Sequence, residues 1–549
     1  MYSNKESINI LTSLLVSHNI KRLVACPGSR NAPIIHNINE CPEIELYPVT
    51  DERSAGFIAL GLALADDKPV AICVTSGSAM LNLAPAMAEA SLRQRSLIVI
   101  TADRPAAWIG QLDGQTLNQP YAFGSLVSKC VSLPEPVNDE QRWYCNRLIN
   151  EALIAAKVKG AKPVHINVPI SEPLFVFDVE KLPEERVLTF VPARLDSDAV
   201  KTTLVPRMLK ASRPMIVLGQ TAKLDAETEF LINGLKDDYV VLAEPLSTDF
   251  PVTFEHVLSY IEHDESYCPD FLLYMGGTLV SKRLKLYLRQ RTINEVWSVS
   301  ENGEIHDTFM QQTGCLAGDI KDVLVALTNG LKDANTIDIN EKKAERQAFC
   351  QCWKQLLISD DTEETLDSNL SLLEIAVKTF EQSLEDMDYD YHVHYANSSS
   401  IRLACKYANH YVWCNRGVNG IEGSLSTAVG FSLATDDMVF CVIGDLSFFY
   451  DQNALWNTNL KGNLRIILLN NKCGGIFYGL KGITESAACD KIIAASHNTE
   501  ARGICTQNDI GYLSAKNIEE LYIGLATLMT SDSQRPMLLE IVQERKIFK

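Results

Sequence analysis

The sequence contains no apolar run that approaches the roughly 20 residues needed for a membrane-spanning helix. Its first residues form an amphipathic helical pattern that lacks the basic segment and small-residue cleavage site of an export signal. Basic residues are also outnumbered, because 50 Lys and Arg face 69 Asp and Glu and the formal net charge is −19. A general nucleic-acid binder needs a basic face that releases counterions. These absences predict a cytoplasmic protein that binds neither membranes nor nucleic acids.

Paired cysteines are absent as well, since the 15 cysteines show no CxxC spacing and several lie in apolar runs such as 439–443. We expect reduced, buried thiols rather than disulfides or zinc ligands. Histidine is scarce, with ten residues, and none lies in the glycine-containing loops described below. We place His36, His394 and His410 on helix or strand surfaces. A mechanism without histidine acid–base groups would depend on a cofactor.

Short β-branched runs alternate with helical patterns along most of the chain. This rhythm is typical of βα units, so we expect an α/β fold with parallel sheets flanked by helices. The 549 residues suit about three domains, because a single core rarely grows beyond roughly 250–300 residues. The expected strands are 22–25, 70–74, 97–101 and 164–168, then 215–218, 240–243, 271–275 and 296–300, and finally 439–443, 465–469 and 537–541.

Two polar stretches divide the chain into three segments. Ser171–Asp196 is rich in proline and charge, which predicts a linker. Ser359–Asn369 carries several acids and has little to bury, so it marks the end of the second segment. We therefore place the first α/β domain at residues 1–178, the central one at 190–355 and the last at 365–549.

One internal similarity links the first and last segments. Residues 61–77 read GLALADDKPVAICVTSG and residues 430–445 read GFSLATDDMVFCVIGD. Each predicts a helix end, an acidic turn, a strand and a glycine loop, and each follows a loop with Glu and Gly, at Glu52 and Glu422. The similarity predicts two related α/β domains around a third.

Oxygen-bearing side chains follow two buried strands of the last segment. Gly444, Asp445, Leu446 and Ser447 come after one strand, and Asn471 follows the next strand, 26 residues after Asp445. A glycine there lets the backbone approach a phosphate, and a helix N-terminus supplies N–H donors. Carboxylate and amide oxygens suit Mg²⁺. Open α/β sheets bind ligands at such strand ends. A plain strand–turn–helix with an asparagine-rich turn is the alternative for these residues alone.

The pattern resembles the signature of thiamine diphosphate (ThDP)-dependent enzymes, in which GDG is followed after some 25–30 residues by NN. The resemblance implies ThDP and Mg²⁺ (or Mn²⁺) as cofactors and a diphosphate-binding last domain. The implied metal ligands are Asp445, Asn471 and the backbone carbonyl of Cys473. Relatives usually have glycine at this last position, and a residue with a Cβ would resist a positive φ. The cofactor-binding residues implied here are Gly444, Asp445, Leu446, Ser447 and Asn471.

Glu52 lies just before the apolar helical run 57–65. An acid at a helix start is common and mildly stabilising, which is the alternative interpretation. By resemblance, Glu52 is the catalytic carboxylate that contacts N1′ of the aminopyrimidine of ThDP. It favours the 4′-imino form, whose nitrogen removes the C2 proton of the thiazolium, so the cofactor performs the difficult step. The first domain would then bind the pyrimidine, and the two sites would meet across the interface of a homodimer or homotetramer.

Six basic residues recur in loops that contain glycine and serine. Guanidinium forks bind carboxylates bidentately, so such a set predicts anionic substrates. Taken singly, each could be a solvated surface residue or a structural ion pair. The six are Arg30, Arg104, Lys282, Arg283, Arg402 and Arg416.

These loops are similar to those of 2-succinyl-5-enolpyruvyl-6-hydroxy-3-cyclohexene-1-carboxylate synthases of menaquinone biosynthesis. Motifs that carry the resemblance include Cys26-Pro27-Gly28-Ser29-Arg30, Thr101-Ala102-Asp103-Arg104-Pro105, Ser281-Lys282-Arg283 and Asn415-Arg416-Gly417-Val418-Asn419-Gly420-Ile421-Glu422-Gly423. That family is a group of transferases that decarboxylate 2-oxoglutarate and add the succinyl-semialdehyde unit to isochorismate. An acetohydroxyacid synthase-like enzyme is the nearest alternative, and a non-catalytic ThDP-fold protein is another. A dehydrogenase is disfavoured, because no G-x-G-x-x-G follows a first strand.

The same resemblance implies the remaining site residues. Arg402 and Arg416 would hold substrate carboxylates, and Ile421 would press on the cofactor. The segment 478–494 lacks the proline-containing stretch expected beside Phe477. The implied substrate residues are Ser29, Arg30, Arg104, Gln115, Lys282, Arg283, Ser398, Arg402, Arg416 and Phe477, and Pro27, Ser398 and Ile421 would also contact the cofactor.

Overall fold

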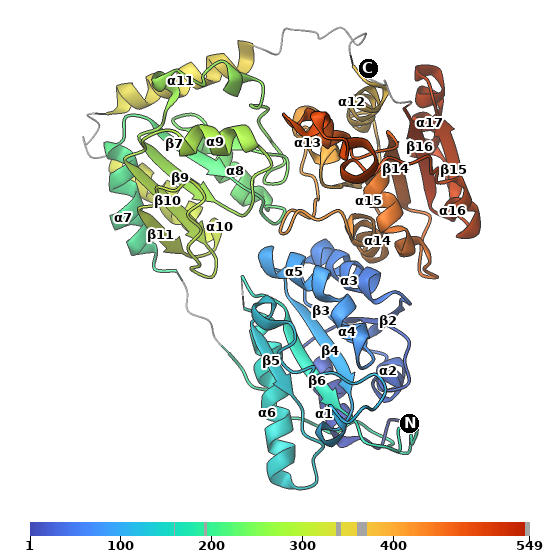
Figure 1. The fold of residues 1–549 in the computed structure, drawn as a ribbon. Helices are drawn as coiled ribbons and strands as arrows, with labels where there is room; N and C mark the ends of the chain where they lie inside the picture. Colours follow the sequence, from blue (N-terminus) through green and yellow to red (C-terminus); the bar gives the residue numbers. More distant parts are fainter. Residues whose placement is uncertain (159, 191–194, 336–341, 360–369, 544–549) are drawn as a thin grey trace. The chain divides into compact units, whose positions relative to one another are not determined.

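The computed structural model describes residues 1–158, 160–190, 195–335, 342–359 and 370–543 (Figure 1). These residues form two compact units. The first unit comprises Met1–Val191, Asp388–Ser400 and Asn415–Lys549, and the second comprises Pro192–Met387 and Ile401–Cys414. The predicted α/β fold with parallel sheets flanked by helices is confirmed (Figure 1). The three sheets fall one in each predicted segment, although the domain bounds themselves stay a prediction. Most of the polar stretch Ser359–Asn369 lies outside the described residues.

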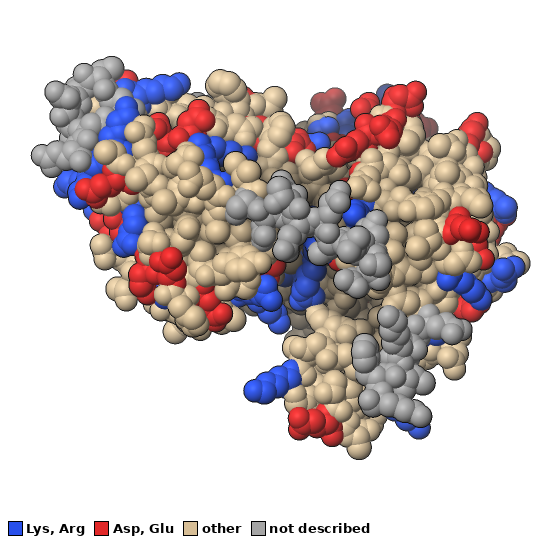
Figure 2. Space-filling view, turned by 90° about the horizontal axis from the view of Figure 1, so that it is seen from above, with Lys and Arg blue, Asp and Glu red and all other residues tan. Residues whose placement is uncertain are grey.

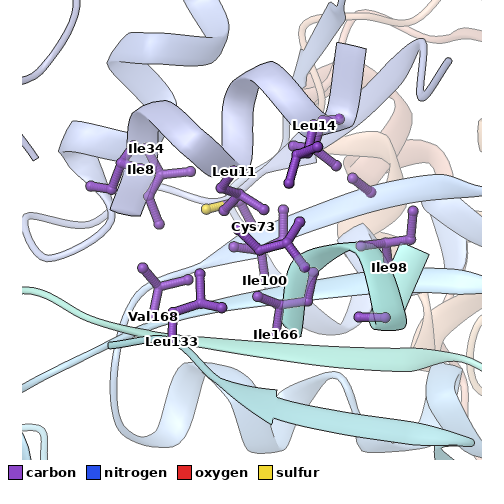
Figure 3. Close-up of a cluster of buried hydrophobic side chains, with 14 of the residues drawn as sticks. Ile8, Leu11, Leu14, Ile34, Cys73, Ile98, Ile100, Leu133, Ile166 and Val168 are labelled. Carbon is purple, nitrogen blue, oxygen red and sulfur yellow. The ribbon is translucent and has the colours of Figure 1, made fainter. Parts of the chain in front are cut away.

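The first sheet has six parallel strands in the order β2-β1-β3-β4-β6-β5. Its core packs helix α1 on the sheet, with Ile8, Leu11 and Leu14 facing Ile98 and Ile100 (Figure 3). The strands are β1 (Arg22–Ala25), β2 (Glu45–Pro48), β3 (Val70–Val74), β4 (Leu97–Asp103), β5 (Lys129–Ser132) and β6 (Val164–Pro169). The helices are α1 (Glu6–Ser17), α2 (Ala32–Asn39), α3 (Glu52–Asp66), α4 (Ser78–Asn82), α5 (Ala84–Leu92) and α6 (Asp139–Ala155).

The second unit contains a five-stranded parallel sheet in the order β11-β10-β9-β7-β8. The strands are β7 (Pro214–Leu218), β8 (Val240–Ala243), β9 (Phe271–Met275), β10 (Glu295–Ser300) and β11 (Gly314–Ala317). The helices are α7 (Ser197–Lys210), α8 (Ala226–Leu235), α9 (Lys282–Arg289), α10 (Ile320–Asn335), α11 (Lys343–Ser359), α12 (Leu372–Leu384) and α13 (Ser399–Tyr407), whose first residues belong to the other unit.

The last sheet has the order β12-β13-β14-β16-β15. Its strands are β12 (Tyr391–Tyr395), β13 (Met438–Gly444), β14 (Leu464–Asn470), β15 (Gly511–Ala515) and β16 (Met537–Val542). Its helices are α14 (Ser424–Ala434), α15 (Asp445–Tyr450), α16 (Arg502–Gln507) and α17 (Ile518–Thr530). If β3 is matched to β13, as the internal similarity predicts, the order β1-β3-β4-β6-β5 of the first sheet repeats strand by strand. The related pair of sheets is therefore confirmed.

The two related sheets meet through equivalent helices, α3 and α14, whose crossing requires glycine. A Cβ at Gly61 would lie 2.1 Å from the carbonyl oxygen of Thr427, and one at Gly430 would lie 2.0 Å from that of Ile58. Gly61 and Gly430 are the first residues of the two similar segments. Small residues at a crossing let two helix backbones come into direct contact. The two related domains thus contact each other through equivalent helices, α3 in the first and α14 in the last.

Two surface properties of the described residues bear on membranes: the apolar character of the helices and the distribution of charge. Among the described residues, no helix combines the length and apolar character that crossing a bilayer requires. Acidic and basic side chains are interspersed over the face shown in Figure 2. Two histidine predictions are wrong. His394 is buried, with 4% of its surface exposed, and it packs edge-on against Phe431. His410 is half-buried in the loop after α13, with its Nε2 2.8 Å from Glu381 Oε2. Burial holds the pKa of His394 well below its ordinary value.

Candidate active site

The ends of β13 and β14 place Asp445 and Asn471 together, as the spacing predicts. The two strands are hydrogen-bonded neighbours, with Gly444 opposite Leu469. Asp445 begins α15 and is buried. The backbone N–H of Leu446 donates to its Oδ1 at 2.7 Å, and the N–H of Cys473 donates to its Oδ2 at 3.1 Å. Burial raises the pKa of Asp445, and the backbone N–H groups of Leu446, Cys473 and Lys472 and the imidazole of His497 oppose that shift.

Three oxygens converge at these strand ends and are called the oxygen cluster below: Asp445 Oδ2, the side-chain oxygen of Asn471 and the carbonyl oxygen of Cys473. The side-chain oxygen of Asn471 faces acceptors only, 3.1 Å from Asp445 Oδ2 and 2.7 Å from the carbonyl oxygen of Cys473. Turning the amide over would let its nitrogen donate to both, and a cation between the oxygens would relieve the same repulsion. In an octahedral Mg²⁺ site with bonds of about 2.1 Å, neighbouring ligand oxygens lie about 3 Å apart. The set therefore fits a hard cation.

The conformation of this loop answers the question raised by Cys473. The left-handed residue is Lys472, with φ 62°, and Cys473 is not among the residues with positive φ. A side chain at position 473 is therefore compatible with a carbonyl that points toward Asp445 and Asn471. Among the described residues there is no cluster of three His, Cys, Asp or Glu side chains, which agrees with a ligand set that contains a single acid.

A buried network that sequence reasoning missed supports the loop from behind. Glu540, fully buried on β16, accepts hydrogen bonds from Asn470 Nδ2 at 2.7 Å and from the hydroxyl of Tyr512 at 2.7 Å. The N–H of Lys472 donates to Asn470 Oδ1 at 3.0 Å. Asn470 thereby holds the turn that carries Asn471 and Cys473. No motif marks Glu540, which is 70 residues away in the sequence.

His497 is a second residue that sequence reasoning missed. Its Nε2 lies 3.3 Å from Asp445 Oδ2, and the N–H of Thr499 donates to its Nδ1 at 3.1 Å. Because Nδ1 accepts, the neutral ring carries its proton on Nε2, facing the carboxylate. The N–H of His497 donates to the carbonyl of Lys472 at 3.0 Å, which ties the segment to the oxygen cluster.

The start of α15 leaves room beside Gly444. A Cβ built there would meet no atom within 4 Å, so a ligand can approach the backbone at this point. Leu446 is half-buried, and Ser447 is buried and donates its hydroxyl to the carbonyl of Ile421 at 2.6 Å. The predicted diphosphate-binding residues therefore lie together at one strand end.

Glu52 is the first residue of α3, and it is half-buried. The helix starts there because Asp51 caps it, accepting from the N–H of Ser54 at 2.8 Å. Asn82 donates to Glu52 Oε2 at 3.2 Å. The neighbours of Glu52 contact the segment that follows Asp445: Asn453 donates to Asp51 Oδ2 at 2.7 Å, and Arg53 donates to the carbonyl of Tyr450 at 2.7 Å. The start of α3 is thus fixed against the region of the oxygen cluster.

The first-domain loops hold two of the predicted arginines in protein contacts. Arg30 is buried, donates to the carbonyl of Ile170 at 2.9 Å and pairs with Glu172 at 3.0 Å. Arg104 pairs with Asp113 at 2.8 Å. Both arginines therefore already bind carboxylates of the chain itself. Pro27, Ser29 and Gln115 are exposed, and the backbone of Gln115 packs against Gly77.

The loop 415–423 brings Arg416 and Ile421 together. Arg416 is buried, with 8% exposed, and donates to Asn397 Oδ1 at 3.1 Å. Asn397 donates to the carbonyl of Gly420 at 2.7 Å, and the next residue, Ser398, is left-handed with φ 75°. A non-glycine residue in this conformation is often found at functional sites. Ile421 remains 39% exposed.

The other predicted residues divide between the two units. Phe477 is half-buried in the short 3₁₀ helix Gly475–Gly479, close to Gly474. The N–H of Gly474 donates to the carbonyl of Ala494 at 2.7 Å. This bond joins the end of the segment 478–494 to the residue after Cys473. Lys282 and Arg283 begin α9 and are exposed, and exposed Arg402 lies on α13. These three belong to the second unit, so their convergence with Arg416 stays a prediction.

Comparison with known proteins decides the family. Two family descriptions match: the N-terminal TPP binding domain of thiamine pyrophosphate enzymes over residues 7–157, and the C-terminal TPP binding domain over residues 396–541. A protein of Bacteroides thetaiotaomicron is 42% identical over 99% of this chain and 97% of its own length. One of Phocaeicola vulgatus is 39% identical over 100% and 97%, and one of Porphyromonas gingivalis is 36% identical over 99% and 95%. All three are named 2-succinyl-5-enolpyruvyl-6-hydroxy-3-cyclohexene-1-carboxylate synthase.

The chain belongs to this synthase family. It is a ThDP-dependent enzyme, and the acetohydroxyacid synthase-like alternative is not supported. The first matched domain contains Glu52, and the second contains Asp445 and Asn471. Family membership therefore agrees with the predicted division of the cofactor site between the two related sheets.

Proposed function

We propose that the chain decarboxylates 2-oxoglutarate and adds the succinyl-semialdehyde unit to isochorismate by 1,4-addition. The products are 2-succinyl-5-enolpyruvyl-6-hydroxy-3-cyclohexene-1-carboxylate and CO₂, and the reaction belongs to menaquinone biosynthesis. The observation that carries the proposal is the similarity to named synthases over nearly the whole chain, at 42% identity for the Bacteroides thetaiotaomicron protein. Because the similarity covers 99% of the chain, it includes all three predicted domains and therefore the residues proposed to bind both substrates.

The proposed cofactor site uses both related sheets. ThDP, when bound, supplies the electron sink for decarboxylation. Glu52 would hold a proton at N1′ of the pyrimidine, and Asn82, which donates to Oε2 at 3.2 Å, would keep its carboxylate in place. Pro27, Ser398 and Ile421 would line the cofactor. Gly444, Leu446 and Ser447 would receive the diphosphate at the start of α15.

The proposed metal is Mg²⁺ or Mn²⁺. Asp445, Asn471 and the carbonyl of Cys473 would hold it, because the Asn471 side-chain oxygen stands 3.1 Å from Asp445 Oδ2 and 2.7 Å from the Cys473 carbonyl oxygen. One carboxylate and two neutral oxygens leave room in an octahedral shell for phosphate oxygens and water. That composition suits an ion that bridges protein and diphosphate.

The proposed substrate residues are the basic loops. Arg416 and Arg402 would bind substrate carboxylates near the reacting carbon, with Ser398 and Phe477 beside them. Ser29, Gln115, Lys282 and Arg283 would shape the isochorismate side. Arg30 and Arg104 would bind the same substrate after releasing their present partners, Glu172 and Asp113. A substrate carboxylate has the same charge as the carboxylate that it would replace.

We further propose a homodimer or homotetramer in the cytoplasm. Large apolar side chains are exposed on α4, α5 and α15 and in the loop that follows α15, around the proposed cofactor site: Leu81 48%, Leu92 61%, Tyr450 52% and Trp456 60%. Apolar surface of this kind marks protein–protein contacts. Sedimentation of the purified chain would show an assembly larger than a monomer, and a fully active monomer at high dilution would contradict it.

The reaction is tested with purified enzyme, ThDP, Mg²⁺, 2-oxoglutarate and isochorismate. We expect release of CO₂ and the adduct by mass spectrometry, and much slower turnover when pyruvate replaces 2-oxoglutarate. No adduct, or equal use of pyruvate, would contradict the proposal.

The metal site is tested with Asp445→Asn. This change should weaken Mn²⁺ binding, followed by electron paramagnetic resonance, by about a hundredfold or more, because a first-sphere charge is removed. Asp437→Asn is the matched control, since Asp437 pairs with His392 at the other end of β13. Unchanged Mn²⁺ affinity in Asp445→Asn would remove the assignment.

A further inference from the structure

Glu89 of α5 carries a buried carboxylate that faces the last domain. Only 2% of the residue is exposed. Its Oε1 accepts the backbone N–H of Gly417 at 2.9 Å, and its Oε2 accepts that of Val418 at 2.8 Å. Each carboxylate oxygen therefore binds one of two consecutive N–H groups. Such charge-assisted pairs are stronger and more directional than neutral hydrogen bonds.

The loop that Glu89 binds also carries Arg416 and Ile421. Within the last domain, Asn397 donates to the carbonyl of Gly420, and Ser447 donates to that of Ile421. From the first domain, Glu89 holds the residues directly after Arg416, and Arg93, one helical turn later, reaches Asn415 Oδ1 at 3.5 Å. Helix α5 and its C-cap residue Arg93 thus contact both sides of the arginine: the backbone N–H groups after it and the Asn415 side chain before it.

The same helical hairpin also contacts Glu52. Asn82, the last residue of α4, donates to Glu52 Oε2, and α5 begins two residues later at Ala84. We propose that Glu89 is a positioning residue for the 2-oxo acid: it fixes the backbone of Gly417 and Val418 so that Arg416 is held where it binds the substrate carboxylate. This inference rests on the role of Arg416 in the proposed function.

A glutamine cannot replace the carboxylate at this position. Its oxygen would accept one N–H, while its NH₂ would face the other N–H with no acceptor between them. Burial raises the pKa of Glu89, whereas Arg93 and the two backbone N–H groups lower it and Glu422 raises it. The ionised form is the one with two free acceptors, so the N–H pair is matched to a carboxylate.

The first experiment compares Glu89→Gln with the unaltered holoenzyme. We expect the KM for 2-oxoglutarate to rise about tenfold, because one strong hydrogen bond to the arginine loop is lost. The affinity for ThDP with Mg²⁺, followed by near-ultraviolet circular dichroism, should change less than about twofold. Glu229→Gln is the matched control, since Glu229 is also buried and accepts the N–H of Asp249 at 2.9 Å in the second unit. An unchanged KM, or an equal loss of ThDP affinity, would overturn the inference.

A second variant moves the loop and keeps the carboxylate. A Cβ at Gly417 would lie 2.9 Å from the carbonyl oxygen and 3.0 Å from Oε2 of Glu89, so Gly417→Ala should push the loop away from α5. We expect the KM for 2-oxoglutarate to rise in the same direction, and an unchanged KM would count against the inference. Arg416→Lys separates the proposed substrate-binding role of Arg416 from the positioning role of Glu89. If it leaves this KM unchanged, the proposed role of Arg416 fails; if it raises KM while both loop variants do not, the positioning role fails.

Discussion

The first and last sheets have the same strand order, but their strand ends differ in how polar groups are satisfied. In the first sheet, Gln119 donates to Asn167 Oδ1 at 2.8 Å and accepts from the N–H of Gly77 at 2.8 Å, while Asn167 donates to Asp103 Oδ2 at 2.9 Å. At the ends of β13 and β14 in the last sheet, the oxygens of Asp445 and Asn471 face each other instead. The first set is satisfied within the chain, whereas in the second the Asn471 side-chain oxygen faces only acceptors.

The difference shows how one fold serves two purposes in a single chain. A closed hydrogen-bond network makes a rigid support, which here fixes the Gly77 loop relative to Asp103. Oxygens that face one another are costly unless a cation joins them, so they create affinity for one. The chemistry therefore follows from the residues at the strand ends rather than from the fold. Changes at equivalent positions of the two halves test this comparison.

The largest effect is expected at the related glutamates, Glu52 and Glu422. Glu52→Gln should lower kcat by about a thousandfold, the range of a lost general acid–base group, while ThDP and Mg²⁺ still bind. Glu422→Gln should cost less than about tenfold, because its carboxylate folds back against Gly420 of its own loop. Single-turnover CO₂ release and circular dichroism of the bound cofactor measure the two properties. Equal turnover in Glu52→Gln and the unaltered enzyme would remove the catalytic assignment.

The sequence predicts the centre of each sheet better than its edges. Every expected strand is present, and the strands missed were β2, β5, β11, β12 and β15, all at sheet edges. Edge strands such as 129–132 (KCVS) and 391–395 (YHVHY) are partly exposed and carry polar residues, so they lack the continuous apolar run of a central strand. Polar residues at the edge also limit pairing with other chains.

The site divides in the same way. Asp445 and Asn471 could be predicted because adjacent parallel strands end at one edge of a sheet, so their spacing has a direct geometric meaning. Glu89, His497 and Glu540 could not, because each contacts the site from an element that no motif marks. A side chain that hydrogen-bonds to backbone N–H groups leaves no pattern in the sequence of its partner.

The second prediction concerns the crossing of the two halves. Gly61→Ala should lower the free energy of unfolding by about 3 kcal/mol, because its Cβ would meet backbone atoms that cannot move aside. Gly503→Ala is the control, since a Cβ on this α16 glycine meets no atom within 4 Å. Its stability should be unchanged or slightly higher, given the helix propensity of alanine. Urea unfolding of the cofactor-free chain measures both, and equal stability of the two variants would mean that α3 and α14 do not cross at Gly61.

The smallest effect is expected from the groups that the two halves bury. Burial lowers the pKa of His165 in the first sheet to about 4, so this ring is neutral, whereas burial raises the pKa of Asp451 after α15 to about 6. Between about pH 4 and 6 the folded chain keeps a proton on Asp451 that the unfolded chain releases, so the contribution of Asp451 to stability falls as pH rises through that window. Above it, the folded chain holds a buried charge.

Asp451→Asn removes that charge and can keep both contacts with Ser426, whose N–H and hydroxyl lie 2.8 and 2.7 Å from the carboxylate. We expect the variant to be more stable by about 1–2 kcal/mol at pH 8 and equal to the unaltered chain at pH 4. Urea unfolding as a function of pH measures the difference. If Asp451→Asn loses the same stability at both pH values, Asp451 acts through hydrogen-bond geometry alone. The buried carboxylate of the last domain would then not weaken the fold at high pH, and the contrast with the neutral His165 of the first domain would fail.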